Sequence, residues 1–253
     1  RLCVLWKPPG WSVSVADDAG AAAERGGPGG GRPLQEWLVR ELEGRCPIAY
    51  DEHVSQGFIH RLDRDTSGAL LWASCYSGFY AARLQLRSKK IRKEYVCLCS
   101  GWVQGSEGFL DSPLLRLELT QGFPRSIPGP EGKQACTEIR GARHLLSPEG
   151  REVSLVLVRL HTGRLHQIRC HLSHAGHPLV GDKVYGASSP AWCSHIFLHA
   201  SRLVTDIGDG LIDVQVPMPR ALKIMLNLLA PTSESSRPLL HQWSQFGDAW
   251  WRF

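Results

Sequence analysis

Short apolar runs along the chain predict a set of β-strands. The runs with the length and composition of strands are Leu2–Trp6, Ala69–Ala73, Val96–Cys99, Val153–Val158, Phe197–Ala200 and Leu211–Val216. The run at 153–158 gives the strongest signal, and the run at 211–216 alternates between apolar and polar positions. Residues 101–150 carry glycine and proline throughout, so we expect mainly loops there.

Apolar residues at helical spacing predict helices in three places. The stripes are Leu34-Trp37-Leu38-Leu42, Tyr76-Phe79-Tyr80-Leu84 and, after Pro219, Leu222-Met225-Leu226-Leu229. Residues 15–33 are rich in Ala and Gly, which indicates a flexible surface insert. Residues 231–253, rich in Ser, Pro and Trp, are predicted to form a linker or an interaction segment.

The composition is that of a globular protein, since 43% of the 253 residues are hydrophobic and 21% are charged. No apolar run approaches the roughly 18 residues that cross a bilayer, so we do not expect a membrane protein. The formal net charge of +5 is compatible with a polyanionic partner without demonstrating one.

The eight cysteines are scattered along the chain and form no Cys-x-x-Cys pair. This pattern favours free thiols in a reducing intracellular compartment (cytoplasm, nucleus or organelle) over disulfides or a zinc knuckle. The first residue is Arg1, and motif-like segments begin almost at once, so we expect the chain to be cut from a longer protein.

The stretch from His60 to Gly68, His-Arg-Leu-Asp-Arg-Asp-Thr-Ser-Gly, compresses two carboxylates, two guanidiniums and an imidazole next to an apolar run. One interpretation is a solvated knot of ion pairs in which Asp65 caps a Thr66-Ser67-Gly68 turn. The other is a catalytic carboxylate that neighbouring arginines keep ionised. The spacing alone leaves both open.

The densest basic patch follows the second predicted helix. Arg83, Arg87 and Lys90 lie at intervals of four and three, which lines them up along one side of a helix. The same patch contains Lys89, Arg92 and Lys93. It is either a solvated helix face or a set of contacts to a nucleic-acid phosphate backbone.

Five histidines lie between positions 161 and 177, but their spacing does not favour a metal site. Gly176 and Pro178 break the helix on which three of them would share a face, and neither HxxxH nor HExxH occurs. The chain also lacks a Gly-x-Ser-x-Gly elbow, a Walker A loop and a dinucleotide fingerprint. Metal-dependent hydrolysis therefore stays a third alternative only.

Several segments, in order, resemble the pseudouridine synthases of the RluA type. They are Lys7-Pro8-Pro9-Gly10, His60 to Gly68, Lys93-Glu94-Tyr95, Thr162 to Leu172, Gly176 to Gly186 and Leu198-His199-Ala200. Their order and spacing agree with the family over roughly residues 2 to 230. Long motifs in the right order are far more specific than a single glycine-rich loop.

The resemblance implies an α+β fold, with a pseudouridine-synthase-like mixed, mostly antiparallel sheet and flanking helices. It implies a catalytic domain at 1–230 that contains the insert at about 15–33, followed by a tail at 231–253. The implied activity is that of an isomerase that converts uridine in rRNA or tRNA to pseudouridine without a cofactor or a metal. A monomer is favoured. The alternative is an inactive, RNA-binding member of the same fold.

The resemblance also implies roles for individual residues. Asp63 becomes the catalytic carboxylate and Asp65 the turn cap, whereas Tyr95 stacks on the base and Arg169 pairs with Asp63. Arg61 and Arg164 are implied for phosphate or structural contacts. Within the basic patch, the predicted substrate-binding residues are Arg87, Lys90 and Lys93.

Three departures from the family pattern border these motifs. Leu165 stands where the family usually has Thr, and Ser12 to Val15 replace a common Val-His-Pro. The glycine-rich insert is longer than expected. None of them touches Asp63, Tyr95 or Arg169, but the last two lie beside the Lys-Pro-Pro-Gly segment, where they could alter substrate fit.

Overall fold

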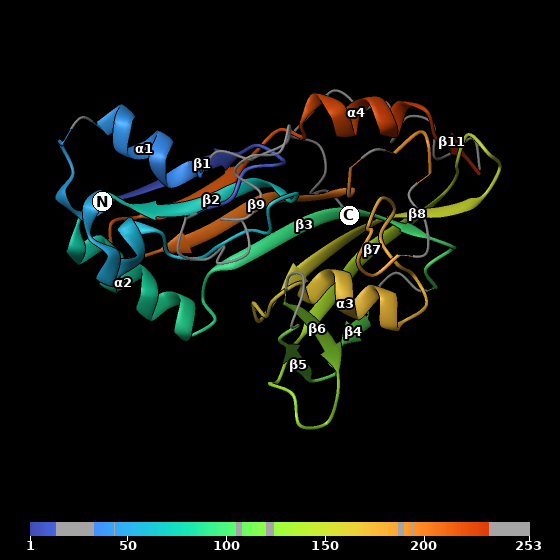
Figure 1. The fold of residues 1–253 in the computed structure, drawn as a ribbon, viewed down its shortest axis with the longest axis horizontal. Coiled ribbons are helices and arrows are strands. Elements are labelled where there is room, and N and C mark those ends of the chain that lie inside the picture. The colour runs from blue at the N-terminus through green and yellow to red at the C-terminus, as the bar shows by residue number, and fades with distance from the viewer. Residues whose placement is uncertain are drawn as a thin grey trace. The chain divides into compact units, whose positions relative to one another are not determined.

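The computed structural model describes residues 1–13, 33–42, 44–104, 108–119, 124–186, 190–193 and 195–232 (Figure 1). The chain divides into two compact units. Unit 1 consists of Arg1–Arg92 and Arg202–Val214, and unit 2 of Lys93–Ser201 and Gln215–Phe253. Most of the predicted insert at 15–33 and of the predicted tail at 231–253 lies outside the described residues. The predicted domain bounds stay a prediction.

Unit 1 is built on strands whose order is β1, β2, β9, with β10 paired to β9. Their bounds are β1 Leu2–Lys7, β2 Ser67–Ala73, β9 Leu198–Asp206 and β10 Leu211–Gln215, of which β9 enters unit 1 at Arg202 and β10 leaves it after Val214. The remaining elements are the helices α1 Leu34–Leu42 and α2 Tyr76–Arg87 and the 3₁₀ turns η1 Pro47–Tyr50 and η2 Glu52–Gly57.

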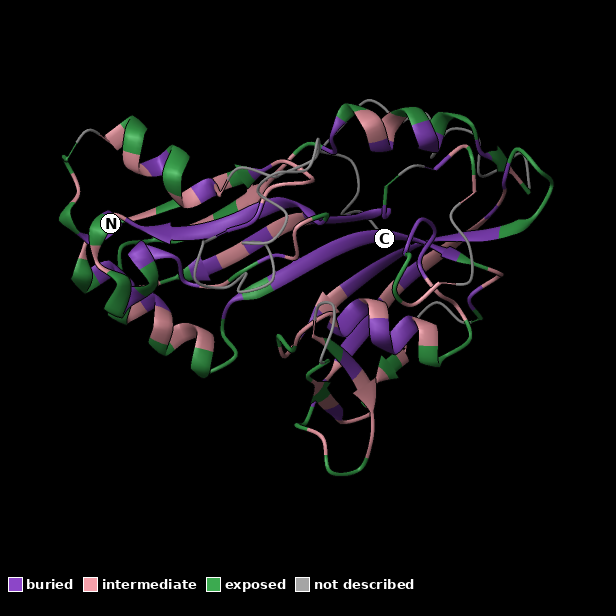
Figure 2. Cartoon of the chain, in the orientation of Figure 1, coloured by how far each residue is buried: buried purple, intermediate pink, exposed green. Residues whose placement is uncertain are grey.

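Every residue of β2 is buried, which confirms the prediction of a buried strand after the charged stretch (Figure 2). The strand begins two residues earlier than predicted. Gly68 already pairs with Lys7 of the antiparallel β1, so it belongs to the sheet rather than to a turn. The turn lies before it.

Helix α2 buries a different face from the one predicted. Phe79 and Ala82 are buried, whereas Tyr76, Tyr80 and Leu84 are 42%, 62% and 64% exposed. The reason is Gly78, since a Cβ at that position would lie 2.7 Å from the carbonyl oxygen of Arg1. The close approach of this backbone turns the Phe79 face inward, so the predicted stripe was wrong.

Unit 2 contains a sheet in the order β9, β3, β8, β7, β11, with β4 on the side of β7, and a separate β5–β6 pair. The bounds are β3 Arg92–Ser100, β4 Gly108–Leu110, β5 Leu114–Leu117, β6 Arg125–Pro128, β7 Thr137–Leu146, β8 Glu152–Leu160 and β11 Ala230–Pro231. Its helices are α3 Gln167–His174 and α4 Arg220–Asn227. The pairs β3–β8, β7–β8, β4–β7, β5–β6 and β7–β11 are antiparallel, and the predicted α+β class is confirmed.

The expectation of loops across residues 101–150 was wrong, because β4 to β7 all lie there. The longest of them, β7, has polar residues at Glu138, Arg140, Arg143 and His144 and a bulge between Ile139 and Gly141. These residues interrupt the apolar pattern that marks a strand. Hydrogen bonds to β8 and to β4 nevertheless satisfy its backbone.

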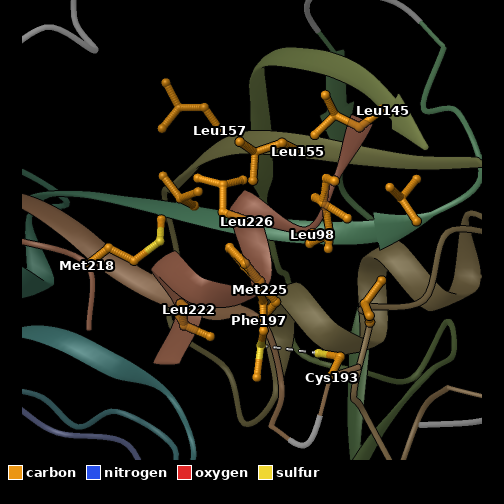
Figure 3. Packing of buried hydrophobic residues seen from close by; sticks show 14 residues of the cluster. Leu98, Leu145, Leu155, Leu157, Cys193, Phe197, Met218, Leu222, Met225 and Leu226 are labelled. Atoms are coloured by element: carbon orange, nitrogen blue, oxygen red, sulfur yellow. Dashed lines mark hydrogen bonds between the residues drawn. The ribbon is translucent and has the colours of Figure 1, made fainter. Parts of the chain in front are cut away.

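The apolar core of unit 2 lies between its sheet and α4 (Figure 3). Leu222, Met225 and Leu226 of α4 pack against residues such as Leu98 of β3 and Leu155 of β8. This confirms the helix predicted after Pro219 and its apolar face. Among the described residues, no helix combines the length and apolar character that crossing a membrane requires.

Candidate active site

Asp63 of unit 1 lies in a tight turn just before β2. The backbone N–H of Thr66 donates to the Asp63 carbonyl over 3.1 Å, which closes the turn around Arg64 and Asp65. Leu62 is buried, Asp63 is half-buried, and Arg61 and Asp65 are exposed. The turn therefore anchors its apolar residue in the core and leaves Asp63 at the boundary between core and surface. Capping by the Asp65 side chain stays a prediction.

Lys7 supports this turn through hydrogen bonds to its backbone and to the neighbouring segment. Its side chain is fully buried, and its ammonium donates to the carbonyls of Pro8, Trp11 and Arg64 over 3.1, 2.7 and 2.8 Å. The amide of Gly10, at a φ of 80°, donates to the same Arg64 carbonyl over 2.9 Å. Residues of the Lys-Pro-Pro-Gly segment thus fix the backbone next to Asp63. The motif was noticed in the sequence, but this role was not predicted.

His60 contributes to the same support. Its Nε2 accepts a hydrogen bond from the backbone N–H of Leu71 over 3.2 Å. A nitrogen that accepts from an amide carries no proton, so the ring is neutral with its proton on Nδ1. The imidazole therefore links the charged stretch to β2.

In unit 2, the register of three antiparallel strands sorts the predicted site residues onto the two faces of the sheet. Tyr95 lies in a row with Val158 and Ile139, and Lys93 in a row with Leu160 and Thr137. Because side chains alternate along a strand, both rows project from the same face, and Glu94 projects from the other. The α4 core occupies the Glu94 side, where Val96 and Leu98 follow it along β3. Tyr95 and Lys93 thus point away from α4.

Helix α3, which carries Arg169, packs on the Tyr95 side. The Oγ1 of Thr137 accepts a hydrogen bond from Gln167 Nε2 over 2.9 Å and lies 3.0 Å from His171 Nδ1. His171 Nε2 lies 2.9 Å from the Ser112 carbonyl, so it carries the proton and Nδ1 accepts from the hydroxyl. Burial lowers the pKa of His171. Figure 1 shows α3 and α4 on opposite sides of the unit 2 strands.

The Thr162–Gln167 loop that leads into α3 is closed by Gln167. Its Oε1 accepts from the Thr162 hydroxyl over 2.7 Å and from the Arg164 amide over 3.0 Å. Its Nε2 also donates to the Cys136 carbonyl over 3.0 Å. The Nε of Arg164 donates to the Gln134 carbonyl over 2.9 Å, so this edge of its guanidinium is already hydrogen-bonded to the backbone. Its predicted contact with phosphate stays a prediction.

Arg169 is oriented by a buried carboxylate that the sequence did not single out. Its Nε and Nη2 donate to the two oxygens of Asp182, each over 2.8 Å, and its guanidinium carbon lies 5.2 Å from the centre of the Tyr185 ring. Burial alone would raise the pKa of Asp182, but the bonds and charge of Arg169 outweigh it and lower that pKa. Amides of Val184 and Tyr185 add to this effect. The predicted pairing of Arg169 with Asp63 stays a prediction, because Asp63 belongs to unit 1.

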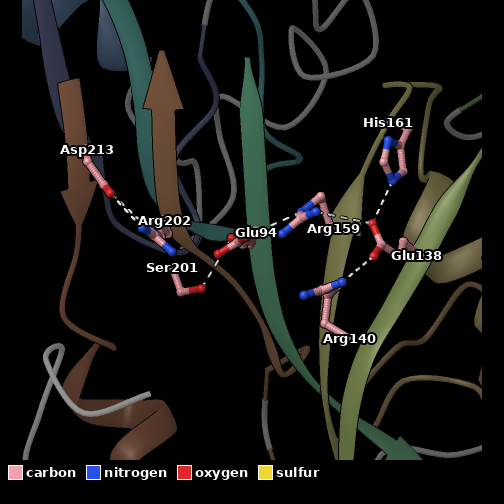
Figure 4. A network of polar contacts seen from close by, with 8 residues as sticks. All are labelled: Glu94, Glu138, Arg140, Arg159, His161, Ser201, Arg202 and Asp213. Atoms are coloured by element: carbon pink, nitrogen blue, oxygen red, sulfur yellow. Dashed lines mark hydrogen bonds and ion pairs between the residues drawn. The ribbon is translucent and has the colours of Figure 1, made fainter. Parts of the chain in front are cut away.

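A row of charges crosses the face of the unit 2 sheet opposite Tyr95 (Figure 4). Arg159 donates to Glu94 over 3.0 Å and lies 3.5 Å from Glu138, which also pairs with Arg140 and His161, each over 2.7 Å. Burial alone would raise the pKa of Glu138, but its cationic partners lower it. Glu94 lies between Lys93 and Tyr95 in sequence, so this row fixes the strand that carries both.

The predicted basic patch does not form one continuous row. Helix α2 ends at Arg87, and Lys89 follows with a left-handed φ of 57°, so Lys90 lies beyond the helix. Arg83 donates to the Ile59 carbonyl over 3.0 Å, whereas Arg87, Lys89 and Lys90 are exposed. Lys93 is buried in β3. The exposed basic residues therefore cluster at the end of α2, whereas Lys93 differs from them because it is buried in a strand.

The histidines between 161 and 177 have different partners. His161 bonds to Glu138, His166 to the Tyr185 hydroxyl, His171 to Thr137 and His177 to the Ser100 carbonyl. Within the described ranges, no group of three or more potential ligands lies close enough to hold a metal ion. Each ring with a described partner therefore supports local structure.

Comparison with known proteins gives a consistent result. A family model described as RNA pseudouridylate synthase matches residues 1–174. A Bacillus subtilis protein described as an uncharacterized RNA pseudouridine synthase is 35% identical over 168 residues, or 65% of this chain and 53% of that protein. The ribosomal large subunit pseudouridine synthase C of Salmonella typhimurium is 36% identical over 183 residues, or 68% and 55% of the two chains. The chain thus spans about half the length of these curated relatives.

Among solved structures, the human RNA Pseudouridylate Synthase Domain Containing 1 resembles this chain with a TM-score of 0.65 and 25% identity. The similarity covers 94% of this chain and 91% of the human one. The matched family model spans the Asp63 turn, β3 with Tyr95, and α3 with Arg169. The resemblance that the motifs indicated is therefore confirmed, and the chain belongs to the RNA pseudouridylate synthase family.

Proposed function

We propose that this chain is an RNA pseudouridine synthase that isomerises specific uridines in rRNA or tRNA. The observation that carries the proposal is the Asp63 turn, in which a half-buried carboxylate is positioned by a buried lysine and by β2. A carboxylate held in a fixed position suits attack on carbon or removal of a proton. The name of the Salmonella typhimurium relative favours large-subunit rRNA as the first substrate to test.

The reaction requires no external oxidant or reductant, because pseudouridine is an isomer of uridine. The bond between N1 of uracil and C1′ of the ribose breaks, the base turns, and a bond between C5 and C1′ forms. The C5 proton leaves and N1 gains a proton, so atoms and electrons balance. Asp63 serves as nucleophile or as base in this sequence, in the way that carboxylates manage positive character at a sugar carbon in retaining glycosidases.

Three residues have distinct roles in the proposal. Asp63 acts on the uridine, Tyr95 stacks on the base and Arg169 pairs with the catalytic carboxylate. The Asp182 carboxylate holds the Arg169 guanidinium with two hydrogen bonds, which reduces the freedom that Arg169 would lose on pairing. The target uridine has to leave its stack to enter such a site.

The decisive experiment replaces Asp63 by Asn. Large-subunit rRNA transcripts and a tRNA pool, both labelled with tritium at C5 of uridine, are incubated with the parent chain and the variant. We expect Asp63→Asn to abolish tritium release and to change RNA affinity by no more than a few-fold, since the amide keeps the size of the carboxyl but is neither nucleophile nor base.

Asp65→Asn is the matched control, because it makes the same change on an exposed residue of the same turn. It should retain activity. A fully active Asp63→Asn variant would show that the mechanism is wrong. A parent chain that binds both RNAs and releases no tritium would instead support the inactive RNA-binding alternative.

A further inference from the structure

Lys93 is a buried lysine on the same face of the unit 2 sheet as Tyr95. It is only 8% exposed and lies in a row with Leu160 and Thr137, directly beside the Tyr95 row. Residues at positions i and i+2 of a strand lie about 7 Å apart on the same face. A ligand in contact with Tyr95 is therefore close to the base of the Lys93 side chain. Its ammonium lies beside Gly163 of the Thr162–Gln167 loop, since a Cβ on Gly163 would be 3.4 Å from Nζ.

The ammonium of Lys93 has no counter-charge in the part of the chain that the structure describes. No ion pair or hydrogen bond of its side chain is found there, and burial is the single cause that acts on its pKa, which it lowers to about 8. Lys7, the other buried lysine, differs, because its ammonium donates to three carbonyls. Most of the Lys93 side chain is therefore buried, and its ammonium lies close to the protein interior without a counter-charge, which costs free energy in the protein without RNA.

On the basis of the proposed function, we propose that the Lys93 ammonium pairs with a phosphate of the RNA strand at the nucleotide whose base stacks on Tyr95. A buried cation is best offset by a full negative charge, and the phosphates are the groups of RNA that carry one at neutral pH. Lys93 then differs from the exposed patch around Arg87. Lys93 contacts the phosphate of the reacting nucleotide, whereas the patch contacts phosphates elsewhere on the RNA.

The first test measures RNA affinity against salt concentration, with a short oligouridylate as the probe. Lys93→Met should weaken binding by roughly ten- to a hundredfold and reduce the slope of log affinity against log salt by about 0.7, the value for one phosphate contact on a single strand. Lys93→Arg keeps the charge and should retain the slope. Lys223→Met removes a lysine from α4, on the opposite side of the sheet, and should change neither quantity.

The second test measures thermal unfolding of the free protein. Methionine has nearly the length of lysine without its charge, so Lys93→Met should raise the melting temperature by removing an uncompensated cation. A lysine with a structural partner inside the protein would give the opposite result. A lower melting temperature for Lys93→Met, or an unchanged salt slope in a folded variant, would overturn the proposal.

These outcomes separate the Lys93 proposal from the proposed function. If the parent chain releases no tritium from uridine and Lys93→Met still loses the salt slope, the enzymatic activity fails and the phosphate contact stands. If the parent chain is active and Lys93→Met keeps its full slope, the phosphate contact fails and the activity stands.

Discussion

At the scale of single residues, two buried charges next to the predicted site residues are stabilised by opposite means. Lys7 donates its ammonium protons to backbone carbonyls around the Asp63 turn. Asp182 accepts from Arg169 and from two backbone amides beside α3. Each charge positions a residue that the sequence motifs predict to be catalytic, Asp63 or Arg169. Each charge can therefore be removed while the predicted catalytic residue is kept.

Lys7→Met tests the support of the Asp63 turn. Three carbonyls lose their shared donor, and we expect the free energy of unfolding to fall by about 3 kcal/mol. The midpoint of urea denaturation measures this loss, provided the slope with urea stays the same. Pseudouridine formation should fall more than RNA affinity, because the Asp63 carboxylate is misplaced and the RNA contacts remain.

Lys133→Met is the control for this variant, since it removes an exposed lysine of unit 2. Its free energy of unfolding should stay within about 0.5 kcal/mol of the parent value. A Lys7→Met variant that is as stable and as active as the parent would mean that the turn holds Asp63 without Lys7.

Asp182→Asn tests the orientation of Arg169. It leaves a largely buried guanidinium beside a neutral amide, so we expect a loss of about 3 kcal/mol at neutral pH, measured by urea unfolding. The lowered pKa of Asp182 means that its contribution is complete above the unfolded-state value near 4 and is lost as the pH falls through the folded-state value. The acid side of the stability curve should therefore be flatter in Asp182→Asn.

The matched control for Asp182→Asn is Glu131→Gln, which neutralises an exposed carboxyl of unit 2. It should reproduce the parent curve. Equal stability of parent and Asp182→Asn at neutral pH would show that the ion pair with Arg169 contributes nothing to the fold.

At the scale of elements, we expect the basic residues at the end of α2 to have a different role from Lys93. Arg87 and Lys90 are exposed, and within the part of the chain that the structure describes no carboxylate forms an ion pair with either. Exposed lysines and arginines contribute sequence-independent, salt-dependent affinity for RNA. The patch should therefore act on binding and not on the chemical step.

Charge reversal in the double variant Arg87→Glu with Lys90→Glu should weaken binding of the labelled large-subunit rRNA transcript. The slope of log affinity against log salt should become shallower by about 1 to 2, since up to two phosphate contacts are lost. Filter binding over a series of salt concentrations measures both quantities. Tritium release at saturating RNA should change little.

Arg220→Glu with Lys223→Glu makes the same change in charge on α4 and is the control for this pair. If both double variants weaken binding equally, the effect is one of net charge. An unchanged salt slope in the Arg87 and Lys90 variant would mean that the end of α2 is a solvated face.

The elements that the sequence predicted well are those whose burial dominates their composition. β8 was predicted from the uninterrupted run Val153–Val158, and every residue of that run is buried. β7 was missed because Glu138 and Arg140 find charged partners within the fold, so the strand needs no apolar pattern there. The face of α2 was mistaken because Gly78 allows a backbone contact that apolar spacing does not reveal.

At the scale of the whole molecule, family and fold class could be predicted from motifs because their order extends over most of the chain. Asp63, Tyr95 and Arg169 were named from that match alone. The supporting roles of Lys7, Gln167 and Asp182 were not predicted, although all three lie in matching segments, because these roles depend on hydrogen bonds between separate segments. A sequence pattern records which residues are present, but it does not give the partner of a buried charge.

The stability of the molecule should depend on pH through His199. This residue is 1% exposed, its Nε2 lies 3.2 Å from the Val216 carbonyl, and burial lowers its pKa to about 4. An unfolded histidine titrates near 6.5. Between pH 4 and pH 6.5 the unfolded chain therefore binds more protons at this histidine than the folded chain. The contribution of His199 to the free energy of unfolding is full above about pH 6.5 and declines as the pH falls toward 4.

This loss amounts to about 3 kcal/mol between pH 6.5 and pH 4, measured by urea unfolding at a series of pH values. His199→Gln keeps a donor for the Val216 carbonyl and should remove most of the decline. His174→Gln, at an exposed histidine of α3, should keep it. A decline of the same size in His199→Gln would assign the acid sensitivity to other groups.

The discontinuity of unit 1 has a consequence for biosynthesis. The strand β2 is synthesised soon after β1, which is one of its two neighbours in the sheet. The other neighbour, β9, belongs to unit 1 only from Arg202 onward and is synthesised much later. At roughly 5 to 20 residues per second, the intervening segment of unit 2 takes on the order of 5 to 20 seconds to synthesise. During that interval a strand that is buried along its whole length in the finished protein has an open hydrogen-bonding edge, which makes the nascent chain a candidate for chaperone binding.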